Sequence, residues 1–147
     1  MEYLSRIFII LDFVNLAFHE AGHIIFGIFG MEFLTALGGT LMQLIMPFSA
    51  FLYFIRQEKK LSSMVTLFWF GENFLPIGNY MKDALKLELP LIGGGLHDWT
   101  YLFGRLGVLT KSVMIGNITI FIGIVIMLYS LVGFCMIGYK RWILKKD

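Results

Sequence analysis

Long apolar runs separated by short polar segments dominate this chain of 147 residues. A helix needs about 20 apolar residues to cross a bilayer. Four runs meet that length, at about 8–30, 33–55, 61–81 and 113–137. Only Met31 and Glu32 separate the first run from the second, so we expect these two to form a tight helical hairpin. The pattern predicts an all-α membrane protein with about four transmembrane helices, in a single membrane-embedded domain covering residues 1–147.

The connection between the third and fourth runs, at about 82–112, is unlike an ordinary polar loop. A proline and three glycines at 93–95 break any helix there. The segment 99–106 that follows is amphipathic and aromatic, which favours a short helix at the lipid interface. Asp98 is its expected N-cap and Gly107 its expected stop. We therefore expect a structured interfacial or re-entrant loop between the third and fourth membrane helices.

Composition and charge narrow the class of protein. The chain is 58% hydrophobic with a mean hydropathy of +0.78, well above a typical soluble domain. The net charge is only +2, and no basic run is interleaved with aromatic residues, so nucleic-acid binding has no support. The lone Cys135 excludes an intramolecular disulfide and a thiolate zinc site. Basic residues at Arg6, 56–60 and 140–146 would all fall on one side of a multi-pass integral membrane protein, which we assign to the cytoplasm.

The first apolar run contains the motif His19-Glu20-Ala21-Gly22-His23. Residues four apart share one face of a helix, so His19 and His23 can both bind one Zn²⁺. Glu20 is then placed to act as general base for a water molecule at the metal. Ionisable residues at membrane depth are costly and therefore functional by default. The alternative is a polar cluster that only forms hydrogen bonds between helices.

Two histidines do not complete a catalytic zinc site, which normally has three protein ligands. His97 is the one remaining histidine, and it lies beside Asp98, after the glycine run. We expect the His97-Asp98 pair to contribute to the site, with His97 as third ligand and Asp98 orienting a ligand, or with these roles reversed.

With the stretch that runs from Asn73 through Pro76 to Asp83, the chain resembles the site-2 protease family of intramembrane zinc peptidases. Members carry HExxH on one membrane helix and an N-x-x-P stretch ending in L-D-G on a later one. The resemblance implies that Asn73 binds the substrate main chain and makes Asp83 an alternative third ligand. Asp83 comes about two residues later than in the family pattern, and Ala84 replaces the family's glycine. The His-Asp-Trp element at 97–99 resembles a small prokaryotic group of peptidase-like membrane proteins, which implies a prokaryotic cell membrane.

The expected function is an intramembrane zinc metalloendopeptidase that uses Zn²⁺ to hydrolyse peptide bonds of a membrane-associated protein. Two alternatives remain open: a membrane zinc hydrolase acting on a lipid amide or ester, and a non-catalytic metal-binding membrane protein. The expected partners are the lipid bilayer and a membrane protein or peptide substrate. Because four helices form a thin wall around a zinc site, a homodimer is also open.

Overall fold

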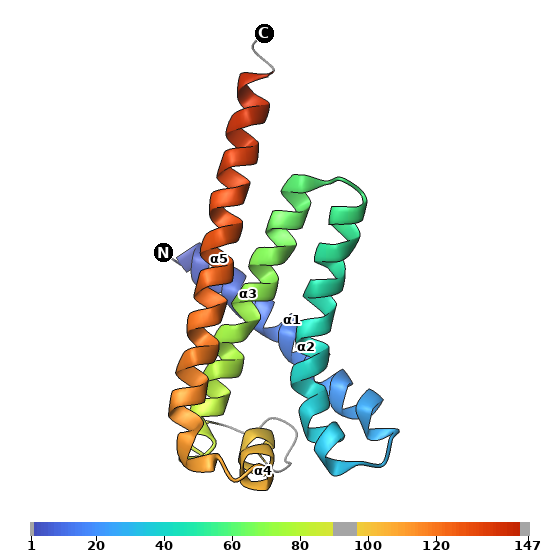
Figure 1. Ribbon diagram of the computed structural model, residues 1–147, viewed down its shortest axis with the longest axis vertical. Helices are drawn as coiled ribbons and strands as arrows, with labels where there is room; N and C mark the ends of the chain where they lie inside the picture. Colours follow the sequence, from blue (N-terminus) through green and yellow to red (C-terminus); the bar gives the residue numbers. More distant parts are fainter. Residues whose placement is uncertain (1, 90–96, 145–147) are drawn as a thin grey trace.

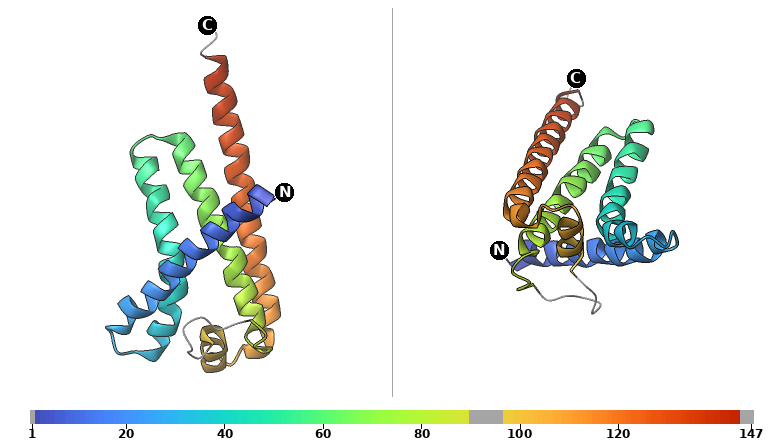
Figure 2. Two further views of the ribbon diagram at one scale, coloured as in Figure 1. Left: turned by 180° about the vertical axis from the view of Figure 1, so that it is seen from behind. Right: turned by 60° about the horizontal axis from the view of Figure 1, so that its bottom comes forward.

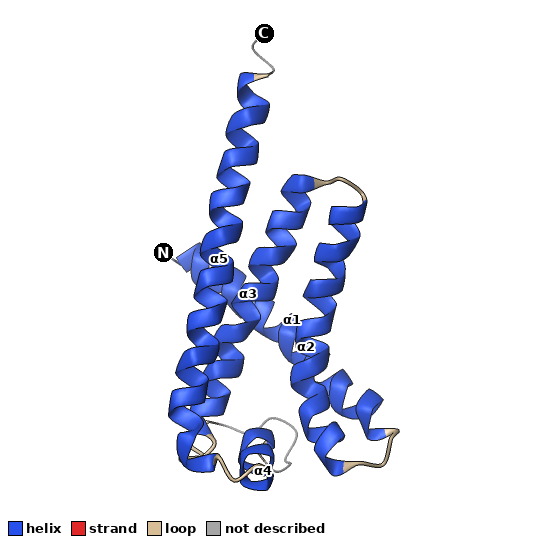
Figure 3. Ribbon diagram, in the orientation of Figure 1, coloured by secondary structure: helices blue, strands red, loops and turns tan. Residues whose placement is uncertain are grey.

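The computed structural model describes the backbone of residues 2–89 and 97–144, and the side chains of residues 10–89 and 97–144. The described chain is helical and contains no strand (Figure 3). The glycine run 93–95 lies outside the described residues. The elements, in chain order, are α1 (Glu2–Gly27), α2 (Glu32–Arg56), α3 (Lys60–Asp83), α4 (Asp98–Arg105), the 3₁₀ turn η1 (Leu109–Lys111) and α5 (Ser112–Ile143).

The long helices form an open bundle. α3 and α5 run side by side, α2 lies on the other side of α3, and α1 crosses the bundle obliquely (Figures 1 and 2). The hairpin expected between the first two apolar runs is present, with α1 and α2 in extensive contact. The short α4 lies at the end of the bundle where α3 finishes and α5 begins (Figure 1).

Two segments are long and apolar enough to cross a membrane: α2, and the stretch Leu109–Ile143 that contains α5. Two of the four expected spans therefore correspond to helices that are long and apolar enough to cross a membrane. α1 and α3 are as long as a span, but polar side chains dilute their hydropathy. On α1 these include Asp12, Asn15 and the motif residues, and on α3 they include Glu72 and Asn73.

α5 buries small residues and exposes large apolar ones, which is the reverse of the pattern in a helix of a soluble protein. Its buried residues are Ser112, Gly116, Gly123 and Ser130, all small. Large apolar side chains cover its outside, among them Ile118, Phe121, Val125, Leu128, Val132 and Met136, each at least 48% exposed. In water, exposed apolar surface of this extent is rare on a monomer, whereas small residues at helix contacts are typical of membrane bundles.

Two pairs of glycines set the contact between α3 and α5. A Cβ on Gly78 would lie 2.6 Å from the carbonyl oxygen of Gly116, and a Cβ on Gly123 would lie 2.6 Å from that of Gly71. No side chain fits at these distances, so the two backbones meet at both points. Gly116 and Gly123 are thus packing positions.

α4 closes the bundle end through an apolar face. Trp99, Leu102 and Phe103 are buried and form one cluster with Ile77 and Met81 of α3. Gly107, at a φ of +69°, follows the helix and turns the chain, as the sequence predicted. The predicted N-cap is wrong by one residue, because His97 rather than Asp98 caps α4. The Asp98 carboxylate is therefore directed elsewhere.

Candidate metal centre

The two motif histidines lie on one face of α1, as their spacing predicts. Their ring centroids are 4.7 Å apart and their planes are nearly perpendicular. Both rings rest on α2 at Gly39, where a Cβ would lie 2.7 Å from His19 Nε2 and 2.8 Å from His23 Cε1. Gly22, inside the motif, meets the backbone of Gly38 in the same way. Three glycines therefore bring α1 and α2 close enough for α2 to form one wall of the site.

Asp98 brings a carboxylate to both histidines from a distant part of the chain. Its Oδ2 lies 3.1 Å from His19 Nε2 and 3.3 Å from His23 Nε2. The three ligand atoms all lie within 4.8 Å of one another. The first turn of α4 positions this side chain, and the Asp98 backbone N–H donates to the Tyr80 hydroxyl of α3 at 3.3 Å.

The other nitrogen of each histidine faces a hydrogen-bond acceptor on α2. His23 Nδ1 lies 2.8 Å from the carbonyl oxygen of Thr35, and His19 Nδ1 lies 3.3 Å from Gln43 Oε1. A carbonyl can only accept, so Nδ1 of His23 carries the proton. In the neutral imidazole, the lone pair is then on Nε2, which faces Asp98. Metal-binding histidines are typically oriented by such a second hydrogen bond.

This donor set fits a metal ion. Two Nε2 lone pairs and a carboxylate oxygen converge, and atoms of this kind attract one another only with a positive centre, a proton or a metal, between them. Zinc bonds of about 2.1 Å in a tetrahedron separate neighbouring ligand atoms by about 3.4 Å. The observed separations of 3.1 and 3.3 Å are close to that value. His19, His23 and Asp98 could therefore hold one zinc ion.

His97 and Asp83, the other two candidates for third ligand, lie together beside this group. His97 Nδ1 accepts the Thr100 N–H at 3.3 Å, and its Nε2 lies 3.6 Å from Asp83 Oδ2. Asp83 in turn accepts the backbone N–H groups of Glu88 and Leu89 at 3.0 and 3.1 Å. Both side chains thus hold the ends of the segment that returns from α3 to α4. The structure brings Asp98, and not these two, to the histidine pair.

The protonation of α4's first residues agrees with these contacts. Burial alone would raise the pKa of Asp98, but hydrogen bonds that His19 and His23 donate when a proton occupies Nε2 outweigh burial and hold this pKa below its ordinary value. A metal ion in place of these protons would favour the ionised carboxylate in the same way. Burial lowers the pKa of His97, and the nearby Asp83 offsets only part of that effect. An ionised Asp98 beside a neutral His97 is the state in which Asp98 binds a cation and His97 accepts a backbone hydrogen bond.

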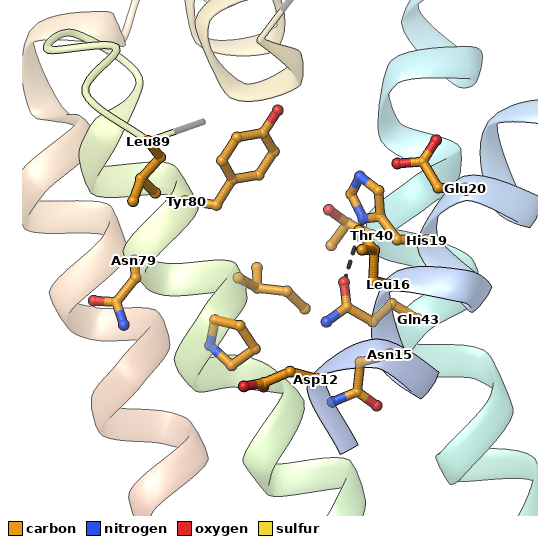
Figure 4. Close-up of a pocket in the computed structure, with 12 residues that line it drawn as sticks. Asp12, Asn15, Leu16, His19, Glu20, Thr40, Gln43, Asn79, Tyr80 and Leu89 are labelled. Atoms are coloured by element: carbon orange, nitrogen blue, oxygen red, sulfur yellow. Dashed lines mark hydrogen bonds between the residues drawn. The ribbon is translucent and has the colours of Figure 1, made fainter. Parts of the chain in front are cut away.

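Glu20 lies next to this centre, on the wall of a cavity of about 510 Å³. Figure 4 shows the cavity between α3, which contributes Tyr80, and the α1–α2 pair, which contributes His19 and Glu20. Most of the residues that line it are polar, yet Leu16, Ile77 and Leu89 give it apolar walls. A group bound in this cavity would lie against His19, one of the three candidate ligands, and against Glu20.

Three polar residues of α1 and α3, namely Asn15, Glu72 and Asn73, are buried in the bundle. Asn73 is completely buried and donates to the carbonyl oxygen of Trp69 at 2.8 Å, and it is not among the residues that line the cavity. Asn15 links the two helices, donating to Glu72 Oε2 at 2.9 Å and accepting the Trp69 indole N–H at 2.8 Å. Asn15 therefore joins helices here and does not orient an imidazole.

Sequence reasoning missed the contribution of α2. Gly39, Thr35 and Gln43 support the two imidazoles, and Thr40 lies on the cavity wall beside them. One signal for them was available, since Thr40 and Gln43 are polar residues three apart within an apolar run. We compared the chain with known proteins, and no protein-family model, curated protein or solved structure matches it.

Proposed function

We propose that this chain is a multi-pass membrane zinc metallopeptidase whose metal ligands are His19, His23 and Asp98. The observation that carries the proposal is the convergence of two imidazole nitrogens and one carboxylate oxygen beside Glu20, at a cavity. HExxH on a helix with a third ligand from elsewhere in the chain is the ligand pattern of zinc peptidases. The resemblance to site-2 proteases in the motif and in the N-x-x-P stretch points to the same chemistry.

The bilayer is the proposed environment of the whole bundle. The exposed apolar surface of α5 and the apolar length of α2 support it. In this arrangement α1 and α3 also lie in the membrane, with their polar side chains turned to one another and to the cavity, where such residues are tolerated. The four-span topology and its location in a cell membrane are part of the proposal.

Each site residue has a defined task in this mechanism. Bound zinc would supply Lewis-acid activation of water and of the scissile carbonyl. Glu20 accepts the proton of the attacking water and delivers it to the leaving amine. Thr35 and Gln43 hold the imidazoles with Nε2 toward the ligand centre, and α4 holds the Asp98 carboxylate against them.

Glu20→Gln tests the chemistry directly. The substitution keeps the size of the side chain and removes its basicity, so proteolysis should cease while about one zinc per chain stays bound. Cells that express wild type or the variant are compared by labelling new N-termini in the membrane-protein fraction and by measuring zinc in the purified proteins.

New N-termini that depend on Glu20 would support the peptidase. Cleavage retained in the variant would remove Glu20 from the base role. Released fatty acid or headgroup products, with no new N-termini, would replace the peptidase with a lipid hydrolase, for which the same activated water is sufficient.

A further inference from the structure

α2 contributes two polar residues to the wall of the cavity. Thr40 and Gln43 line it beside His19, and they are only 5% and 6% exposed. They are three residues apart on a helix, so they share a face and their side chains lie about 5–6 Å apart. No contribution to the ligand set accounts for Thr40, because the described hydrogen bonds of both imidazoles end at other groups.

The Thr40 hydroxyl is buried without a partner among the described residues. Figure 4 shows its side chain at the cavity between His19 and Tyr80. A buried hydroxyl that makes no hydrogen bond destabilises the fold, and such groups are rare in native proteins. A ligand in the cavity would provide the missing partner.

Gln43 presents the complementary group. Its Oε1 faces His19 Nδ1, so its amide nitrogen points the other way, toward the cavity (Figure 4). Thr40 can therefore accept a hydrogen bond while Gln43 donates one, on the same wall. In an extended peptide, the N–H and C=O of one residue point to the same side and match this pair.

The described residues contain no strand, and this bears on how Thr40 and Gln43 could bind a substrate main chain. A peptidase often holds its substrate by adding it to the edge of a sheet, which supplies main-chain hydrogen bonds. Residues 2–89 and 97–144 offer no such edge, and in this part of the chain the polar side chains of the cavity wall are the groups available to a substrate main chain. Asn73, the residue expected to do so, is not part of the cavity wall.

We infer that Thr40 and Gln43 bind the main chain of an extended polypeptide segment beside the metal centre. The inference rests on the proposed function and names the substrate contact of that same site. A helical segment would not fit this role, since its N–H and C=O groups are already paired with one another. The substrate is thus an unwound stretch of chain.

The test separates the metal anchor from the main-chain contact. The affinity of zinc-loaded protein in detergent is measured for two probes. Acetohydroxamate offers only a zinc-binding group, and the second probe is a hydroxamate attached to a short peptide. The affinity for the peptide hydroxamate divided by the affinity for acetohydroxamate measures the peptide contact alone. Thr40→Val replaces the hydroxyl with a methyl group of similar size. It should lower this ratio about three- to tenfold, which is the effect of losing one hydrogen bond. Zinc content and acetohydroxamate affinity should not change.

A second readout distinguishes a binding hydroxyl from a structural one. Because the Thr40 hydroxyl has no hydrogen-bond partner among the described residues, Thr40→Val should melt at the same temperature as wild type or higher. Gln43→Glu keeps an oxygen for His19, removes the amide N–H, and should also lower the affinity ratio. Thr66→Val is the matched control, because the Thr66 hydroxyl bonds within α3 at 3.1 Å and lies outside the cavity wall. Its affinity ratio should equal that of wild type.

An unchanged ratio in Thr40→Val would overturn the inference and leave the proposed function intact. Octanoyl hydroxamate binding more tightly than the peptide probe would also overturn it, in favour of an acyl chain in the cavity. Wild-type protein that holds no zinc or does not bind acetohydroxamate would show that the proposed function itself has failed.

Discussion

The α1–α2 and α3–α5 contacts both depend on glycine, yet only the α1–α2 contact places candidate metal-binding side chains against its glycines. At α3–α5, the glycine pairs bring two backbones together, and the side chains against them are mostly apolar, together with the aliphatic part of Lys82. At α1–α2, Gly22, Gly38 and Gly39 do the same, but the groups placed against the glycines include both motif histidines. Glycines thus allow two helices to pack closely at both contacts. Only the α1–α2 contact is a candidate site, because α1 carries the two motif histidines there.

The two contacts should therefore respond differently to substitution. A change at the α1–α2 contact should alter metal binding, and a change at the α3–α5 contact should alter stability. α4 belongs to both, since it packs on α3 and delivers Asp98 to α1.

Removing the carboxylate should have the largest effect. Asp98→Ala deletes a ligand, and because loss of a supporting partner alone costs about 10- to 100-fold in metal affinity, loss of a ligand should cost more than about 100-fold. Zinc affinity is measured by competition with a chelator on purified protein. Circular dichroism of the variant checks that the helices are still formed. Zinc affinity close to that of wild type would remove Asp98 from the ligand set.

Gly39→Ala should weaken zinc binding about 10- to 100-fold, because the added Cβ displaces both imidazoles from α2. Gly138→Ala on α5 is the matched control, since a Cβ there meets nothing within 4 Å. The same chelator competition measures both. Equal zinc affinity in the two variants would show that the α1–α2 approach does not position the histidines.

Gly123→Ala, in contrast to Gly39→Ala, should lower stability and leave zinc affinity unchanged. The new methyl group overlaps the Gly71 carbonyl and Phe74, which costs about 1–3 kcal/mol of overpacking. Thermal unfolding in detergent should show the loss, while the folded variant keeps wild-type zinc affinity. A fall in zinc affinity as large as that of Gly39→Ala would mean that the two contacts are coupled.

His97→Asn should have the smallest effect. Asparagine is a good N-cap and can accept the Thr100 N–H in place of the imidazole, so α4 keeps its position. Zinc affinity should remain within about threefold of wild type, since His97 is outside the ligand set of this account. A drop comparable to that of Asp98→Ala would make His97 a ligand.

The sequence predicted the long helices and the proximity of the two motif histidines, which form part of the candidate site. Length and hydropathy located the long helices, and the spacing of His19 and His23 placed both imidazoles on one face. Two spans were not shown, because polar side chains on α1 and α3 face the bundle, and hydropathy averages over all faces of a helix.

The choice of Asp98 as the candidate third ligand could not be made from the sequence for a geometric reason. His97 and Asp98 are adjacent, and neighbouring residues at a helix start point in different directions. Which of them caps α4 decides which one reaches α1, and this depends on where α4 docks on α3. The support from Gly39, Thr35 and Gln43 depends likewise on the crossing of α1 and α2, which no local pattern encodes.

X-ray absorption at the zinc edge of the purified, zinc-loaded protein tests the ligand set most directly. We expect two imidazole ligands together with oxygen ligands at about 2.0–2.2 Å, in a four-coordinate site. Three imidazoles would place His97 on the metal and contradict the assignment of Asp98. Protein that takes up no zinc would contradict the metal centre itself.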